Sequence, residues 1–376
     1  MKNLYFLLIF SFLFYSCSSI SLREGLNINE KFDWLQIGRN ERKNNISDSD
    51  FILKPPFEEL WKFNADAAFE RNSLSLCDGV LFASCLNGDI FAIDVKNGSG
   101  IGKVNTKNKS SNTTPLIMKD IITVTFGSGQ KNYIAGYDFI TGEYKWKKLT
   151  GETLNSPISK DSKIFYSSTK GNIYKIDDES GRNIWIYKNK FPFQSSPAIC
   201  NGILLNGDIK GNLLAVDVSG GNLKWNYKTE GGIYSDVSIY RNKIFFGSDD
   251  KFYYCLDTNG TVIWKKNLDT KFLSSSTFYL DNVLCTGING KIFSLNINTG
   301  EVVWEFETKG TITASPVLNG DKVYIGSFDR YFYCLDANKG DVIWKYEFDE
   351  RIRTSAVIWK KYLLIACDDK SIYCFK

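Results

Sequence analysis

The chain has 376 residues, no histidine, and 46 basic against 42 acidic side chains, which gives a formal net charge of +4. The opposite charges are interspersed and form no basic stripe, so the sequence excludes the electrostatic footprint of a nucleic-acid-binding protein. The lack of histidine removes the commonest general acid–base residue and the commonest metal ligand.

A targeting segment is predicted at residues 1–16. It has a positive charge near its start and an apolar run at 4–14, which is too short to span a bilayer and has the layout of a secretory signal. The small residue followed by Cys17 resembles a bacterial lipoprotein cleavage site, which implies a lipid on Cys17. By the same resemblance, Ser18 favours the periplasmic face of the outer membrane. An ordinary signal peptide with a chance cysteine is the alternative.

Residues 17–56 are polar and rich in Ser, Asn and Asp, which predicts a flexible tether from the membrane anchor. An apolar patch at 32–40 interrupts this tether. We expect the patch to dock on the domain that follows, and the sequence leaves open whether Trp34 takes part in that contact. The pair at 55–56, two prolines, marks the last break before the next domain.

A repeat with a period of about forty residues fills residues 57–376. Its mark is an Asp or Asn, then a Gly, then a Trp four residues after the Gly. The tryptophans at this position are 39 or 40 residues apart from 146 to 344. Eight equivalent positions at this period predict a propeller or another repeat array. These positions are Trp61, Trp146, Trp185, Trp225, Trp264, Trp304 and Trp344, with Val104 assigned to the eighth, in a degenerate copy.

One repeat is expected to contain four short strands. In the last complete repeat they are predicted at 314–318, 322–326, 331–335 and 341–346, because these runs are rich in β-branched and aromatic residues and are bounded by Gly, Asn or Asp. Four antiparallel strands per forty residues make one propeller blade, and no helical periodicity supports a helical solenoid. The sequence therefore predicts an all-β, eight-bladed propeller of four-stranded blades.

The two ends of the repeat region are expected to complete the last blade together. Residues 345–376 supply three strands without a Trp strand, whereas residues 57–63 form a Trp strand without the other three. Pairing of these segments closes the ring and removes open sheet edges.

The recurrent residues of the repeat have structural explanations. An Asp such as Asp336 ends a strand, where its carboxylate accepts backbone N–H groups in a turn. The Gly that follows supplies a backbone conformation with positive φ, and the Trp is expected to wedge between neighbouring blades. The nine cysteines include no Cys-x-x-Cys motif. We expect those in the repeats to be buried free thiols, with a disulfide left open as the alternative.

These units resemble the pyrroloquinoline-quinone-type (PQQ-type) propeller repeat. The resemblance rests on the Tyr-x-Leu-Asp…Thr-Gly-x-x-x-Trp pattern, best preserved at 293–304 and 332–344, and on Ser-Pro pairs at 156–157, 196–197 and 315–316. With eight repeats, a lipoprotein signal and no further domain, the chain is similar to the BamB family of lipoprotein scaffolds in the outer-membrane β-barrel assembly machinery. A fold alone does not determine function.

The resemblance implies a non-catalytic scaffold without a cofactor, held at the outer membrane by its lipid. Such a scaffold would bind periplasmic domains of a BamA-like barrel protein through loops that correspond here to 188–196 and 229–237. The family usually has an Arg in the first loop, where this chain has a Gln. The resemblance places the contact on Phe191, Phe193, Gln194 and Asp236. Packing of the two phenylalanines over the blade edge is the alternative.

Two other functions remain open. The PQQ-dependent quinoprotein dehydrogenases are the other large class built on this repeat, and they carry an adjacent cysteine pair beside the cofactor and calcium-binding acidic ligands at the channel mouth. This chain has no Cys-Cys dipeptide, so we expect it not to be an enzyme. The third possibility is a surface lipoprotein that binds another ligand.

Overall fold

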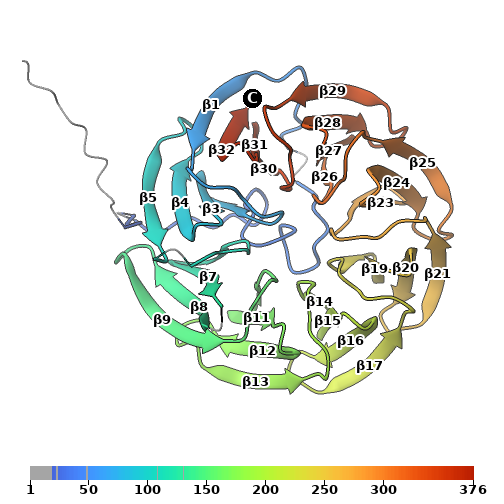
Figure 1. Cartoon of the computed structure of the whole chain (residues 1–376), viewed down its shortest axis with the longest axis horizontal. Helices are drawn as coiled ribbons and strands as arrows, with labels where there is room; N and C mark the ends of the chain where they lie inside the picture. The colour runs from blue at the N-terminus through green and yellow to red at the C-terminus, as the bar shows by residue number, and fades with distance from the viewer. Residues whose placement is uncertain (1–18, 23, 48–49, 108, 130) are drawn as a thin grey trace, which may run out of the picture.

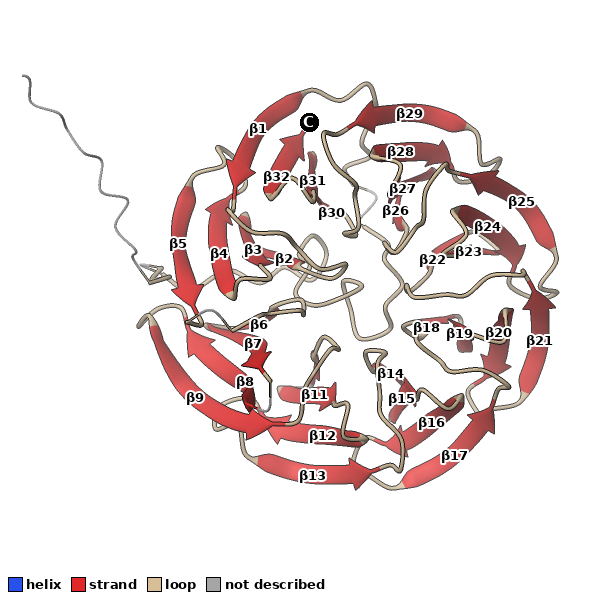
Figure 2. Cartoon of the chain, viewed as in Figure 1, coloured by secondary structure: helices blue, strands red, loops and turns tan. Residues whose placement is uncertain are grey.

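The computed structural model describes residues 19–22, 24–47, 50–107, 109–129 and 131–376. Within these residues, thirty-two strands form eight four-stranded antiparallel sheets around a common axis (Figure 1). The regular elements drawn in Figure 2 are strands joined by loops. The prediction of an all-β, eight-bladed propeller is therefore confirmed. No helix of the described chain is long and apolar enough to cross a bilayer.

Blades 1 to 7 are each built from four consecutive strands, and blade 8 joins the two ends of the chain. Blades 1 and 2 contain β2 (Leu74–Cys77), β3 (Val80–Ser84), β4 (Asp89–Asp94), β5 (Gly100–Asn105), β6 (Leu116–Met118), β7 (Ile121–Ser128), β8 (Lys131–Asp138) and β9 (Glu143–Thr150). Blades 3 and 4 contain β10 (Ile158–Lys160), β11 (Lys163–Ser167), β12 (Asn172–Asp177), β13 (Asn183–Lys188), β14 (Ala198–Cys200), β15 (Ile203–Gly207), β16 (Asn212–Asp217) and β17 (Leu223–Lys228).

The remaining blades continue the same order around the ring. Blades 5 and 6 contain β18 (Ser238–Tyr240), β19 (Lys243–Gly247), β20 (Phe252–Asp257), β21 (Val262–Asn267), β22 (Thr277–Tyr279), β23 (Asn282–Thr286), β24 (Lys291–Asn296) and β25 (Val302–Glu307). Blades 7 and 8 contain β26 (Val317–Asn319), β27 (Lys322–Gly326), β28 (Tyr331–Asp336), β29 (Val342–Glu347), β30 (Val357–Trp359), β31 (Tyr362–Ala366), β32 (Ser371–Phe375) and β1 (Glu59–Asn64).

The second and third strands of each blade are buried on both faces, because neighbouring blades cover them. In blade 7, β27 and β28 are buried along almost their whole length, whereas the outermost strand β29 is mostly exposed. This burial explains the nearly continuous apolar runs of the inner strands and the more polar sequence of the outer one. We call the end of the ring where the first strand of each blade turns into the second the turn face, and the opposite end the loop face.

Closure of the ring follows the predicted pairing. Strand β1 pairs antiparallel with β32, with Trp61 opposite Cys374, and the backbones of Glu58 and Lys376 exchange two hydrogen bonds of 3.0 Å. Figure 1 shows the N-terminal and C-terminal strands side by side in one blade. The prediction that an N-terminal strand completes the last blade is therefore confirmed, and no blade of the described ring is left with three strands.

The Gly and Trp of the repeat meet across the blade interface. A Cβ atom added to Gly340, for example, would lie 2.6 Å from the Trp304 ring of the preceding blade. Six indole N–H groups donate to a backbone carbonyl of the next blade, just after its turn Asp or Asn. These bonds join Trp61 to Val95 (2.9 Å), Trp146 to Asp178 (2.7 Å), Trp185 to Val218 (3.0 Å), Trp225 to Thr258 (3.1 Å), Trp264 to Ile297 (3.1 Å) and Trp304 to Ala337 (3.1 Å).

The register of blade 1 corrects the assignment of Val104 to the Trp position. In blade 7, Trp344 lies opposite Cys334, next to a bulge. The equivalent residue of blade 1, which lies opposite Ala92 next to the same bulge, is Gly102. Val104 was assigned because it stands four residues after Gly100. The turn glycine of blade 1, which packs on the Trp of the preceding blade, is instead Gly98. The repeat therefore has no side chain at this position of blade 1.

Candidate functional site

The centre of the ring is filled by residues 33–47, which we call the central segment. It is the blue chain that crosses the middle of the ring in Figure 1. The segment contacts the first strand of every blade, and most of these contacts are backbone hydrogen bonds. In blade order, its partners are Leu76, Ile117, Ser159, Ile199, Ile239, Thr277, Leu318 and Ile358.

These contacts have a common physical cause. The first strand of each blade has one edge facing the central axis, and its N–H groups there would be unpaired if the centre were empty. The carbonyl groups of Leu35, Glu41 and Arg42 accept three of these N–H groups, each at 2.8 Å. The central segment therefore acts as a hub that satisfies the inner edges of the blades.

Trp34 docks on the ring. Its side chain is 3% exposed, and its indole N–H donates to the carbonyl of Ile358 at 2.8 Å. Contacts with the blades extend beyond the expected docking segment at 32–40, because Ile20 and Lys43 are also fully buried. Much of the described part of the expected tether is thus packed on the turn face of the ring.

Around the axis, neighbouring blades are joined by a ring of polar contacts from the Ser-Pro element of the repeat. The backbone N–H of one blade donates to the side-chain oxygen at the same position of the next blade. The bonds run from Thr114 to Ser156 (2.9 Å), Ser156 to Ser196 (3.1 Å), Ser196 to Asp236 (2.6 Å), Ser275 to Ser315 (3.1 Å) and Ser315 to Ser355 (2.8 Å).

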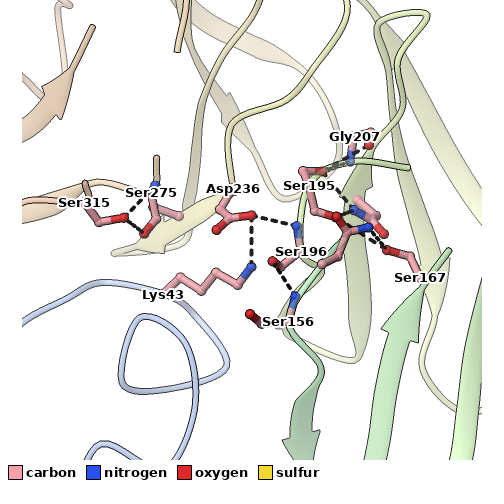
Figure 3. A network of polar contacts seen from close by, with 12 residues as sticks. Lys43, Ser156, Ser167, Ser195, Ser196, Gly207, Asp236, Ser275 and Ser315 are labelled. Carbon is pink, nitrogen blue, oxygen red and sulfur yellow. Dashed lines mark hydrogen bonds and ion pairs between the residues drawn. The ribbon is translucent and has the colours of Figure 1, made fainter. Parts of the chain in front are cut away.

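Asp236 is the acidic member of this polar ring, and Lys43 of the central segment points at it (Figure 3). The ammonium nitrogen lies 3.6 Å from the Asp236 carboxylate, and both side chains are almost completely buried. Burial lowers the pKa of Lys43 from its usual value of 10.5 to about 8, although the negative charge of Asp236 opposes the shift and Arg71 adds to it. The ion pair therefore joins the central segment to blade 5, and burial from water strengthens the attraction between the two charges.

The structure separates the four residues predicted to bind a partner. Phe193 is fully buried in the apolar core between blades 3 and 4, and Asp236 belongs to the polar ring. A side chain without exposed surface cannot contact a partner, which corrects the expectation for these two residues. Phe191 and Gln194 are partly exposed on the loop face. Cys17 lies outside the described residues.

On the loop face, the axis opens into a funnel of about 330 Å³. Arg353 on its wall donates to the Asp368 carboxylate at 2.7 Å, and its guanidinium lies 5.9 Å from the centre of the Phe328 ring. These two contacts hold the Arg353 side chain in place. In blades 2 to 8 the wall repeats one position, the residue two before the member of the polar ring. Lining residues include Asn72, Asn112, Leu154, Gln194, Tyr234, Leu273, Thr313 and Arg353, together with Glu70, Arg71 and Phe328.

The donor groups at the axis do not fit a quinone cofactor with a calcium ion. The central segment occupies the turn-face side of the axis, and Lys43 extends into the middle. The funnel lining contains one carboxylate among the described residues, that of Glu70, whereas calcium takes six to eight oxygen ligands. No group of three or more His, Cys, Asp or Glu in the described chain is placed to hold a metal ion. The eight described cysteines are free and buried.

Sequence reasoning missed Lys43, because a lysine in a polar stretch is ordinarily solvated. A signal was present at its partner. Of the seven residues joined in the polar ring, five are Ser and one is Thr, and Asp236 alone places a carboxylate there. An acidic residue at a position where the repeat otherwise has Ser or Thr indicates a basic partner that the repeat itself does not contain.

The fold and the axis define the class of this protein: a closed, eight-bladed propeller of PQQ-type repeats whose centre is filled by its own N-terminal segment. The chain belongs to the family of the outer membrane protein assembly factor BamB, whose sequence pattern matches residues 58–187 and 188–376. A search of curated proteins found no match.

Solved structures share the fold. BamB from Moraxella catarrhalis has a TM-score of 0.74 and 17% sequence identity, over 85% of this chain and 99% of that chain. Quinohemoprotein alcohol dehydrogenase from Comamonas testosteroni has a TM-score of 0.79 and 13% identity, over 93% and 81% of the two chains. The computationally designed protein Ika8 has a TM-score of 0.72 and 12% identity, over 85% and 99%. At these identities the likeness concerns the fold alone.

Proposed function

We propose that this protein is a non-catalytic, lipid-anchored scaffold of outer-membrane β-barrel protein assembly. The observation that carries the proposal is the match to the BamB family across the whole propeller, residues 58–376. The anchor would be a lipid on Cys17, which would place the protein on the periplasmic face of the outer membrane. The partner would be a BamA-like barrel protein with periplasmic domains.

We assign the partner contact to the funnel on the loop face. The loops at 188–196 and 229–237 contribute Gln194 and Tyr234 to its wall. Tyr234 and Arg353 lie there, and Tyr and Arg are enriched among the residues that dominate the energy of protein–protein contacts. Arg353 is held by Asp368, so it loses little conformational freedom when a partner binds. We therefore propose the funnel as the partner-binding surface, in place of the side chains of Phe193 and Asp236, which are buried.

A PQQ-dependent dehydrogenase is the second candidate. It is supported by the likeness in fold to the quinohemoprotein alcohol dehydrogenase from Comamonas testosteroni. The filled axis and the single carboxylate of the funnel argue against it, since such a site needs room and several oxygen ligands for calcium. Binding of another ligand by a surface lipoprotein is the third candidate.

Affinity capture tests the proposal. The tagged, lipidated protein is purified from membranes solubilised in a detergent that preserves membrane complexes, and co-eluting proteins are identified. We expect a BamA-like barrel protein in near-stoichiometric amount. Recovery of the protein alone would contradict the scaffold function, and uptake of a quinone with calcium-dependent dye reduction would instead support the dehydrogenase.

A further inference from the structure

One blade interface of the ring is completed by the N-terminal chain. Blade 1 has Gly102 at the Trp position, and the backbone of Ser19 and Ile20 lies where its side chain would be. A Cβ atom added to Gly102 would come within 3.0 Å of the Ser19 carbonyl oxygen and 3.1 Å of the Ile20 Cα. Residues 19–20 therefore occupy the space that an indole fills at the other interfaces.

The hydrogen bonds of this replacement match those of the missing indole. Phe139 follows the turn Asp of blade 2, so its carbonyl is the equivalent of the indole acceptors elsewhere in the ring. It accepts the N–H of Leu22 at 2.6 Å. The hydroxyl of Tyr137 donates to the Ile20 carbonyl at 3.1 Å, and that of Ser21 donates to the Ile140 carbonyl at 3.0 Å. Ile20 itself is fully buried.

This docking fixes where a lipid would leave the protein. Cys17 stands two residues before Ser19, and an extended chain spans at most about 3.6 Å per residue. A lipid on Cys17 would therefore be attached within about 7 Å of the docked chain, at the outer rim between blades 1 and 2. In Figure 1 the described chain enters the ring at this place, between β5 and β9.

The rim along β9 carries basic and apolar side chains. Blades 1 and 2 are basic as a whole, with nine lysines and three acidic residues between positions 96 and 148 against a net charge of +4 for the whole chain. On β9 itself stand Lys145, which pairs with Glu179 of the next blade, Lys147 and Lys148.

On the outermost strand β9, Leu149 is 63% exposed and Tyr144 is 36% exposed. Lys147 between them is exposed and lies 4.5 Å from the centre of the Tyr133 ring. Basic residues near an anchor attract anionic lipids, and interfacial aromatic residues prefer the headgroup layer.

We propose that the rim of blade 2, along β9, lies flat against anionic lipid headgroups. The propeller would then stand on its edge, with the loop-face funnel turned sideways and open to the periplasm. This inference rests on the proposed lipid anchor at Cys17. A lipid chain together with a basic patch holds a protein on a membrane far longer than a single acyl chain does.

Fluorescence quenching in vesicles tests the inference. The lipidated, full-length protein is reconstituted in phosphatidylethanolamine with about a quarter phosphatidylglycerol, a composition that supplies the anionic charge. A thiol-reactive dye is placed at either end of β9, by Glu143→Cys or Leu149→Cys. Glu301→Cys and Glu307→Cys are the controls at the same repeat positions of β25, in the opposite blade 6. The eight cysteines of the described chain are buried, and the unsubstituted protein measures any labelling of native cysteines.

We expect spin-labelled lipid to quench the dye at both β9 positions several-fold more than at both β25 positions. Lys147→Glu should reduce quenching at position 149, whereas Lys345→Glu, with the same charge change at the same repeat position of blade 7, should not. Quenching at position 143 alone, or equal quenching on both blades, would overturn the inference while leaving the anchor intact. Mass analysis showing an unmodified Cys17 would contradict the anchor and remove the basis of the inference with it.

Discussion

At the scale of single residues, the turn glycine of six repeats does two things. It adopts a left-handed backbone conformation, with φ of +79° at Gly340, and it leaves room for the tryptophan of the preceding blade. The turn glycine could be explained from the sequence, because Asp and Gly at a strand end indicate a turn. Its contact with Trp304 could not, since that contact joins two blades.

We predict that Gly340→Ala destabilises the protein more than Gly202→Ala. Both glycines have φ near +77°, but an added Cβ atom meets Trp304 only at Gly340 and meets nothing within 4 Å at Gly202. The backbone strain common to both should cost about 1–2 kcal/mol, and the overpacking at Gly340 about 1–3 kcal/mol more. Chemical denaturation of the two variants measures the difference. Equal losses would show that the tryptophan contact is unimportant.

The buried pair of Lys43 and Asp236 gives a second prediction. Lys43→Met leaves the Asp236 carboxylate buried without a counter-charge, which should lower the free energy of unfolding by about 3–5 kcal/mol. Asp236→Ser added to this variant should recover most of the loss, because Ser is the usual residue of the polar ring and still accepts the Ser196 N–H. Additive losses in the double variant would contradict a direct pairing.

The same pair predicts a dependence of stability on pH. The pKa of Lys43 is about 8 in the folded protein and near 10.5 when unfolded. Between these values the unfolded chain binds the extra proton, so the stability contributed at this position rises with pH, by at most about 1.4 kcal/mol per unit. Unfolding free energies of the parent and of the Lys43→Met, Asp236→Ser double variant should therefore diverge between about pH 8 and 10.5. Parallel curves would show that the folded pKa is not lowered.

At the scale of elements, the strands were predictable, whereas the central segment was predictable only in its first part. Strands such as β27 and β28 repeat an apolar pattern in every blade, and that pattern has a direct structural meaning. The apolar patch at 32–40 indicated the docking of Trp34, which is buried. Residues 41–47 contact the blades mainly through their backbone, at Glu41 and Arg42 for example, so this part carries little apolar signal. Its role depends on the unpaired inner edges of eight strands, which exist only once the ring is assembled.

The docked N-terminal chain makes a prediction at this scale. Ile20→Asp should release residues 19–22, because it would bury a carboxylate in the apolar cluster that surrounds Ile20. Hydrogen exchange should become faster at 100–105 and 138–142. Gly102→Trp restores the residue of the repeat, so it should also release residues 19–22 but keep the interface protected. Unchanged exchange in both variants would contradict the docking.

At the scale of the whole molecule, the ring is closed twice. Strand β1 completes blade 8 from outside, and the central segment joins all eight blades from inside. The first closure was predicted from two incomplete repeats, and the second was invisible to a repeat pattern. Because the blades are held together at the outer edge and at the centre, the ring is rigid. Rigidity suits a scaffold, since its binding surface loses little conformational entropy when a partner binds.

The most direct test of the scaffold account is the affinity of the purified protein for the purified periplasmic domains of the BamA-like protein, measured by calorimetry. We predict one-to-one binding that Leu154→Asp, in the funnel of the loop face, weakens at least tenfold. Leu280→Asp is the matched control, because Leu280 is an exposed leucine on the turn face, and it should leave the affinity unchanged. Absence of binding, or an equal loss in both variants, would contradict the account.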